Sequence, residues 1–148
     1  MILDIIQDLD FLRKKSKTVI VIDDELRELV SNMVETMEAH NGVGISAPQV
    51  GLLKKIIIVK PENDIFVFIN PSITSYNSNM ISMEEGCLSI PNYSRVVSRF
   101  SNIKIEALDL SGSKIKMELS GLFARIFQHE LDHLNGILIS DKSNKKID

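Results

Sequence analysis

The chain has 148 residues, of which 44% are hydrophobic and 25% charged, with a formal net charge of −3 and a single cysteine. This length and composition predict one soluble globular domain spanning residues 1–148, large enough to bury a core. The sequence excludes an internal disulfide, a basic surface typical of nucleic-acid binding and an apolar run that could span a bilayer, so we expect a cytoplasmic protein.

The first strongly periodic segment lies between residues 26 and 37, where apolar side chains recur every three or four positions. This spacing predicts an amphipathic helix with Asp23 or Asp24 as its N-cap and a stop at residues 41–42. The glycines and the proline that follow predict a loop or an extended segment over residues 42–49.

Short runs rich in β-branched and aromatic residues predict strands in the middle of the chain. The runs cover residues 56–60, 65–69, 94–100, 103–110 and 114–119. The last run alternates apolar and polar side chains, which is typical of an antiparallel strand with one buried face. Residues 109–113 predict the hairpin turn before it, and the polar residues 142–146 predict a loose C-terminal end.

The last predicted helix begins near Ser120 and ends at residues 135–136. Its apolar side chains cover so wide an arc that we expect the helix, with its histidines and glutamate, to be buried. Two neighbouring stripes contain Leu122, Ile126, His129 and His133, and Phe123, Phe127, Glu130 and Leu134. We therefore predict an α+β fold in which antiparallel strands pack around this central buried helix.

His129, Glu130 and His133 form a His-Glu-x-x-His motif on the predicted helix. Residues four apart on a helix lie on one face, about 6 Å apart, so both imidazoles can bind one metal ion. Glu130 is next to the first of these ligands and within reach of a water that the ion activates. Burial of an unpaired carboxylate would be costly, which also favours a cation nearby.

A catalytic metal of this kind needs a third protein ligand. Asp141 is suitable by residue type, but its surroundings indicate an exposed position. His40 ends the first helix, where a cation interacts favourably with the helix dipole, and is expected to be a surface or capping residue. Cys87, in a glycine-containing and turn-like stretch, is the strongest candidate.

Three separated motifs, taken together, resemble those of the peptide deformylase family. They are GVGISAPQ at residues 42–49, EGCLS at residues 85–89 and QHELDHLNG at residues 128–136, in the order of the family. The resemblance implies a hydrolase that removes the formyl group from the N-terminal methionine of newly made polypeptides and releases formate.

The resemblance implies that Cys87, His129 and His133 bind one divalent metal ion. The usual physiological ion of the family is iron(II), and zinc, nickel or cobalt can substitute. Glu130 would take a proton from water and return it to the departing amine nitrogen.

The resemblance also implies roles for residues around the metal. Gln49, through its side-chain amide, and Leu88, through its backbone N–H, would donate hydrogen bonds to the oxyanion. Gly44 would let its backbone approach and hydrogen-bond the substrate peptide. Val43 and Ile126 would line the apolar slot for the methionine side chain.

Further positions refine this comparison with the family. Glu85 and Arg99 occur where the family carries an acidic and a basic residue, and we expect them to pair and brace the cysteine loop. Ser46 replaces a common alanine, which is a mild change. Residues 7–10 replace a proline-rich segment of many relatives and leave the local N-terminal path open.

Two alternatives remain open from the sequence. Another small metallohydrolase, such as an endopeptidase, is disfavoured because no suitable third ligand follows the histidine pair. A catalytically silent peptide-binding protein is disfavoured because Glu130, Gln49 and the metal ligands are all present. The expected partners are N-formyl-methionyl nascent peptides. The resemblance allows a transient ribosome contact, although we expect no long C-terminal helix to make it.

Overall fold

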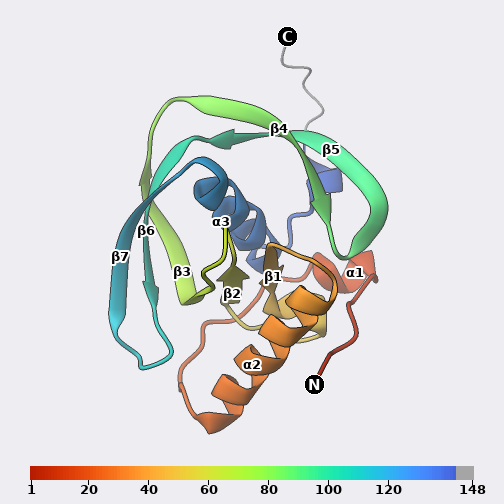
Figure 1. Ribbon diagram of the computed structural model, residues 1–148, viewed down its shortest axis with the longest axis vertical. Helices are drawn as coiled ribbons and strands as arrows, with labels where there is room; N and C mark the ends of the chain where they lie inside the picture. The colour runs from red at the N-terminus through yellow and green to blue at the C-terminus, as the bar shows by residue number, and fades with distance from the viewer. Residues whose placement is uncertain (143–148) are drawn as a thin grey trace.

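Two antiparallel β-sheets and three α-helices make up residues 1–142, the part that the computed structural model describes (Figure 1). The helices are α1 (Leu9–Leu12), α2 (Asp24–Ala39) and α3 (Gly121–Leu134), with 3₁₀ helices η1 (Ala47–Val50) and η2 (Ile139–Asp141). The strands are β1 (Gly44–Ser46), β2 (Ile56–Val59), β3 (Phe66–Tyr76), β4 (Met80–Cys87), β5 (Ile90–Phe100), β6 (Asn102–Leu108) and β7 (Lys114–Ser120). The predicted mixture of helices with antiparallel strands is confirmed.

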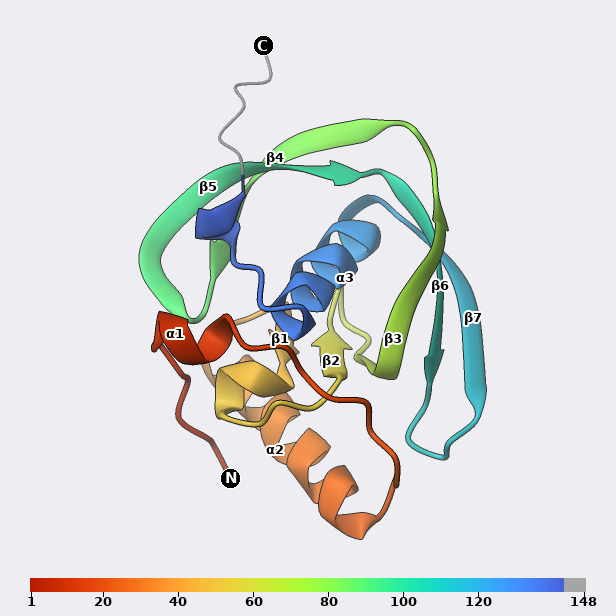
Figure 2. The ribbon, with the colours of Figure 1, turned by 180° about the vertical axis from the view of Figure 1, so that it is seen from behind.

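The sheets place α3 between them. One sheet has the strand order β1-β2-β3-β6-β7, and the other consists of β4 and β5. In both views β4 and β5 arch over α3, while the larger sheet curves around its other side (Figures 1 and 2). No helix in residues 1–142 is long and apolar enough to cross a membrane.

Strand β2 lies between two hydrophobic cores, and all four of its side chains are completely buried. Ile57 and Val59 belong to the core that includes α3, whereas Ile56 and Ile58 belong to the core that includes α2. A strand covered on both faces requires an unbroken apolar run instead of an alternating one. This arrangement explains the sequence of β2 and fixes α2 and α3 on opposite faces of the sheet.

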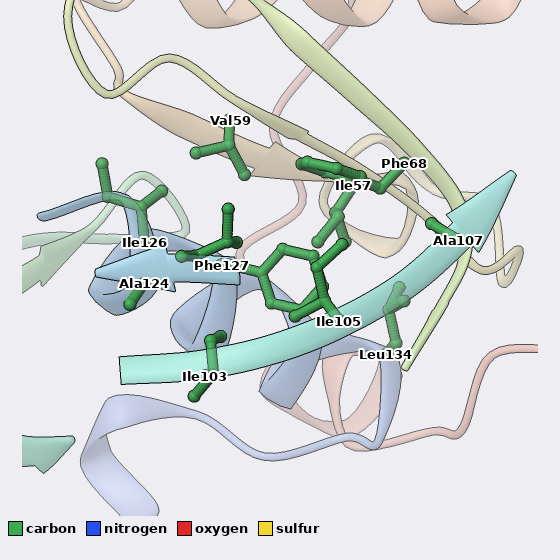
Figure 3. Packing of buried hydrophobic residues seen from close by; sticks show 11 residues of the cluster. Ile57, Val59, Phe68, Ile103, Ile105, Ala107, Ala124, Ile126, Phe127 and Leu134 are labelled. Carbon is green, nitrogen blue, oxygen red and sulfur yellow. The ribbon is translucent and has the colours of Figure 1, made fainter. Parts of the chain in front are cut away.

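The core beneath α3 is built around aromatic side chains (Figure 3). Phe127 of α3 packs edge-to-face on Phe68 of β3, with ring centroids 5.1 Å apart. Aromatic pairs of this geometry contribute roughly 0.5–1.5 kcal/mol beyond their buried area. The remaining members of this core are Ile57, Val59, Ile103, Ile105, Ala107, Leu119, Ala124, Ile126 and Leu134.

Both predicted long helices are confirmed, with ends set by local chemistry. The Asp23 carboxylate accepts a hydrogen bond from the backbone N–H of Leu26 at 2.9 Å, so Asp23 is the N-cap of α2. Helix α2 ends at Ala39, and Asn41, two residues later, has a left-handed φ of 54°. Helix α3 follows Ser120 as its N-cap, and Gly136 just after its end has a φ of +72°.

The predicted strands were incomplete in four places, one of which is β5, which begins at Ile90 and not at residue 94. Strand β3 continues to Tyr76, beyond the predicted end at residue 69, and residues 44–46 pair as the short edge strand β1. Strand β4 was not predicted, because residues 84–86 are two glutamates and a glycine, which are rare in strands. Pairing with β5 along its whole length overrides that preference.

The predicted hairpin turn at residues 109–113 is confirmed. The Asp109 carboxylate accepts hydrogen bonds from the backbone N–H groups of Ser111 and Ser113, at 2.9 and 3.0 Å. Of the predicted loose tail, Lys142 instead pairs with Asp132 at 3.0 Å. Residues 143–146 lie outside the described part of the chain.

Replacement of Gly136 by alanine tests the turn that follows α3. A Cβ atom there would lie 2.2 Å from the carbonyl oxygen of Arg13, whereas a Cβ on Gly121, which also has a positive φ, meets nothing within 4 Å. We expect Gly121→Ala to lower the free energy of unfolding by about 1 kcal/mol through backbone strain, and Gly136→Ala by about 3 kcal/mol. Urea denaturation measures both, and equal losses would contradict the close contact with Arg13.

Candidate metal centre

Three potential metal ligands converge where β4 ends against α3. His129 and His133 lie one turn apart on α3, with ring centroids 5.2 Å apart. Cys87 reaches them because the β4–β5 register shifts between Gly86 and Cys87. Cys87 Sγ lies 3.3 Å from His133 Nε2, and the three ligand atoms all lie within 4.8 Å of one another.

The electrostatics of this cluster suit a cation. Burial lowers the pKa of His133 to about 3, so this imidazole is neutral, the form that binds a metal ion. Burial opposes a charge on His129 too, but the neighbouring Glu130, Cys87 and Glu85 outweigh it and raise the pKa of His129 to about 10. Positive charge is therefore favoured between these groups, and one thiolate with two imidazoles suits iron(II) or zinc.

Glu130 lies beside the cluster in a buried position. Its side chain is buried, and within residues 1–142 its Oε1 has no hydrogen-bond partner. Burial raises the pKa of Glu130 to about 7. A carboxylate near neutrality, with one oxygen unoccupied by the protein, is suited to exchange protons with a water molecule.

A buried ion-pair network holds the first histidine in place. His129 Nδ1 donates to Glu85 Oε1 at 2.9 Å, which leaves Nε2 available to a metal ion. Arg99 binds the same carboxylate through two hydrogen bonds, of 3.0 and 2.9 Å, as predicted for the Glu85–Arg99 pair. Burial opposes ionisation of Glu85, but His129 and Arg99 outweigh it and hold the pKa of that carboxyl well below its usual range.

Two members of this network, Arg125 and Asp132, were not predicted from the sequence. Arg125 of α3 donates to Glu85 Oε2, and Arg99 donates to Asp132 as well as to Glu85. A signal for Arg125 was available, because an arginine on a helix that is apolar over a wide arc needs a buried partner. Asp132 carried no such signal, since an acidic residue between two metal ligands reads equally well as solvated.

Gln49 is held with its amide nitrogen directed at the cysteine. The backbone N–H of Ser46 donates to Gln49 Oε1 at 2.9 Å, and the Ser46 hydroxyl donates to the same oxygen at 3.1 Å. Gln49 Nε2 then donates to Ser89 Oγ at 3.3 Å and faces Cys87 Sγ at 3.6 Å. The hydroxyl of Ser46, which a common alanine at this position would lack, therefore adds a hydrogen bond that fixes the orientation of Gln49.

The predicted site residues, except His133, line one cavity of about 640 Å³. Its lining includes Val43, Gly44, Gln49, Cys87, Leu88, Ile126, His129 and Glu130. Ile126 is buried in the wall, whereas Val43 is 50% exposed. His40 instead caps α2 through a 2.8 Å contact to Thr36 O, and Asp141 pairs with Arg13 at 2.9 Å, so neither belongs to the cluster.

Gly44 has a steric role that the sequence did not indicate. A Cβ atom at this position would lie 2.5 Å from Glu130 Oε2 and 2.7 Å from Ile126 Cγ2. A Cβ on Gly42 would lie no closer than 3.0 Å to its nearest neighbour, Leu88 Cδ1 at the end of a flexible side chain. The absence of a side chain at residue 44 therefore makes room for the Glu130 carboxylate.

Comparison with known proteins agrees with this geometry. The profile of the polypeptide deformylase family matches residues 2–147. The chain belongs to this family. It is 43% identical over 138 residues to the peptide deformylase of Thermodesulfovibrio yellowstonii, covering 90% of this chain and 83% of that protein. It is 44% identical over 136 residues to peptide deformylase 1 of Clostridium perfringens, covering 90% and 92%.

The structural comparison gives the same answer over the whole described fold. The crystal structure of the Thermotoga maritima peptide deformylase superposes with a TM-score of 0.94 at 38% identity, covering 96% of this chain and 97% of that one. A Synechococcus elongatus peptide deformylase in complex with actinonin superposes with a TM-score of 0.93 at 38% identity, covering 97% and 80%. The protein is therefore a metal-dependent deformylase, which removes the N-formyl group from nascent peptides.

Gly44→Ala should impair this deformylase without unfolding it. The added Cβ displaces the Glu130 carboxylate, and a misplacement of about 1 Å can cost roughly 100-fold in turnover. Gly42→Ala is the matched control, since its new contact falls on the flexible end of Leu88, and we expect a much smaller loss. Steady-state formate release measures both variants, and equal activities would show that residue 44 tolerates a side chain.

Proposed function

We propose that residues 1–148 form a single catalytic domain that hydrolyses the formyl amide of N-formyl-methionyl nascent chains in the cytoplasm, with iron(II) as the ion in vivo. The observation that carries this proposal is the convergence of Cys87, His129 and His133 beside the unpartnered carboxylate oxygen of Glu130. Zinc, nickel or cobalt would substitute, since each accepts sulfur and nitrogen ligands.

The metal would be held by Cys87 Sγ and by one nitrogen of each histidine. When bound, the ion supplies a Lewis acid for the formyl oxygen and lowers the pKa of water towards neutrality. The protein contributes the orientation of these ligands: Glu85 fixes the ring of His129, and the shift in the β4–β5 register after Gly86 accompanies the entry of Cys87 into the cluster.

Glu130 moves the proton in this proposal. Its carboxylate takes a proton from the attacking water as the new C–O bond forms, and then delivers it to the amide nitrogen as the C–N bond breaks. Formate and a free N-terminal amine are the products. The pKa of Glu130, which burial raises towards 7, suits a group that must both accept and return a proton near neutral pH.

Two hydrogen-bond donors would stabilise the oxyanion. One is the side-chain amide of Gln49, whose direction Ser46 and Ser89 fix before substrate binds. The other is the backbone N–H of Leu88, directly after the cysteine. Donors held in place in this way cost no reorganisation during the reaction, and losing one of them typically costs about 10²–10³-fold in turnover.

The cavity supports selection of a formyl-methionyl end. Ile126 and Val43 would contact the methionine side chain, one deep in the cavity and one near its mouth. Strand β1, which contains Gly44, pairs only with β2 among the described strands, so its other edge can accept main-chain hydrogen bonds from a peptide. No membrane or direct nucleic-acid contact enters the proposal, and a transient ribosome contact stays a prediction.

The function is tested by formate release from an N-formyl-methionyl tripeptide. The protein is prepared without oxygen and loaded with iron(II) or nickel(II), and a chelator is added to a parallel sample. Turnover that the chelator abolishes supports the proposal. A folded, stoichiometrically metallated protein that releases no formate would favour the silent peptide-binding alternative.

Glu130→Gln should retain the metal and lose about 10²–10⁴-fold in turnover, because the amide cannot accept the proton from water. Metal content by elemental analysis and formate release are measured on the same sample. Cys87→Ala is the converse control: with only two protein ligands left, it should lose its metal during dialysis. Near-normal turnover by Glu130→Gln would refute the role of Glu130 in proton transfer. Unchanged metal content in Cys87→Ala would refute the role of Cys87 as a metal ligand.

A further inference from the structure

Arg125 is a buried residue that forms hydrogen bonds with β4, with β5 and with the carboxylate that orients His129. It is 6% exposed and lies on α3 one turn before His129. Its Nη1 donates to Glu85 Oε2 and to the carbonyl oxygen of Val97 on β5, the latter at 3.0 Å. Its Nη2 donates to the carbonyl oxygen of Ile81 on β4. One guanidinium therefore contacts both β4 and β5 and also the carboxylate that orients His129.

We propose that Arg125 is a positioning residue for the metal ligand His129 and acts on it through Glu85. The Glu85 carboxylate accepts four hydrogen bonds, two on each oxygen. Oε1 accepts from His129 Nδ1 and Arg99 Nη2, and Oε2 accepts from Arg99 Nε and Arg125 Nη1. A carboxylate has about four acceptor positions, so all of them are filled and its plane is fixed.

Arg99 cannot fulfil this role alone, because it also serves a second carboxylate. Its Nη1 donates to Asp132 while its Nε and Nη2 bind Glu85. Two guanidinium groups and the Lys142 ammonium thus face two carboxylates, of which Glu85 is buried and Asp132 is 19% exposed. Without Arg125, Arg99 would be the only guanidinium on Glu85 while it still binds Asp132, and Glu85 would be freer to turn away from His129.

The inference rests on the metal ligands of the proposed function, but its test does not depend on activity. The protein and Arg125→Met are loaded with nickel(II) and mixed with excess chelator, and metal release is followed over time. Loss of a partner that orients a ligand typically weakens metal binding about 10–100-fold. We expect Arg125→Met to release nickel at least about tenfold faster than the parent protein.

Gln128→Met is the matched control for a general loosening of α3 against β5. The Gln128 side chain is buried and makes no contact with Glu85. Its Oε1 accepts a hydrogen bond from the backbone N–H of Phe100 at 3.0 Å, and its Nε2 donates to the carbonyl oxygen of Phe100 at 2.8 Å. This variant should lower the midpoint of thermal unfolding and leave the rate of nickel release unchanged. Arg125→Lys, which keeps the charge but has a single ammonium group, should release nickel at an intermediate rate.

Three results would overturn the inference: unchanged release by both Arg125 variants, equal acceleration by Gln128→Met, or a parent protein that binds no divalent metal. Failure of the proposed function looks different. A protein that holds nickel, shows the Arg125 effect and releases no formate would refute the deformylase mechanism and leave the role of Arg125 intact.

Discussion

Burial of charged and polar groups on α3 is the constraint on which the rest of the structure depends. The helix must pack its apolar face into a core, yet it also carries two imidazoles and a carboxylate that are almost completely buried. Each of these groups would destabilise the fold if left without a partner. The strand pair β4–β5 meets this requirement for the histidines, because it brings Glu85 to His129 and Cys87 to His133, whereas Glu130 Oε1 has no partner within residues 1–142.

The same requirement divides the molecule into two kinds of interior. Below α3, the aromatic core and strand β2 are apolar and close-packed, with Phe68 and Phe127 in contact. Above α3, toward the arch, the interior is a charged network with alternating carboxylates and guanidinium groups. The apolar core fixes the position of the helix, and the ionic network fixes the rotation of the side chains on its upper face.

The sequence predicted the parts of this arrangement that depend on local periodicity. Helices α2 and α3 follow from apolar spacing, and the histidine pair follows from the geometry of one helical turn. The pairing of Glu85 with Arg99 and the importance of Gln49 came from motifs, since nothing local indicates which distant residue will meet them. Strand β4 escaped prediction because it contains two glutamates and a glycine, so its pattern lacks the apolar alternation that marks a strand.

Long-range features remained out of reach for a related reason. The close approach of Gly44 to Glu130 joins the edge of one sheet to the middle of a helix far along the chain. A glycine read from sequence indicates a turn or a close contact, but it does not name the group that occupies the space. Likewise, Arg125 could be expected to need a buried partner, whereas its two carbonyl acceptors depend on how β4 and β5 cross the helix.

Metal affinity in this fold is therefore a property of docking between two elements. A single helix supplies two ligands in a geometry that follows from its own turn, but the third comes from the end of β4. Cys87 meets the histidines only if strands β4 and β5 are positioned correctly over α3. The hydrogen bonds that link these strands to the helix are those of His129 with Glu85, Arg125 with Glu85 and Arg99 with Asp132. Residues that are not metal ligands themselves thus help to bring the three ligands together.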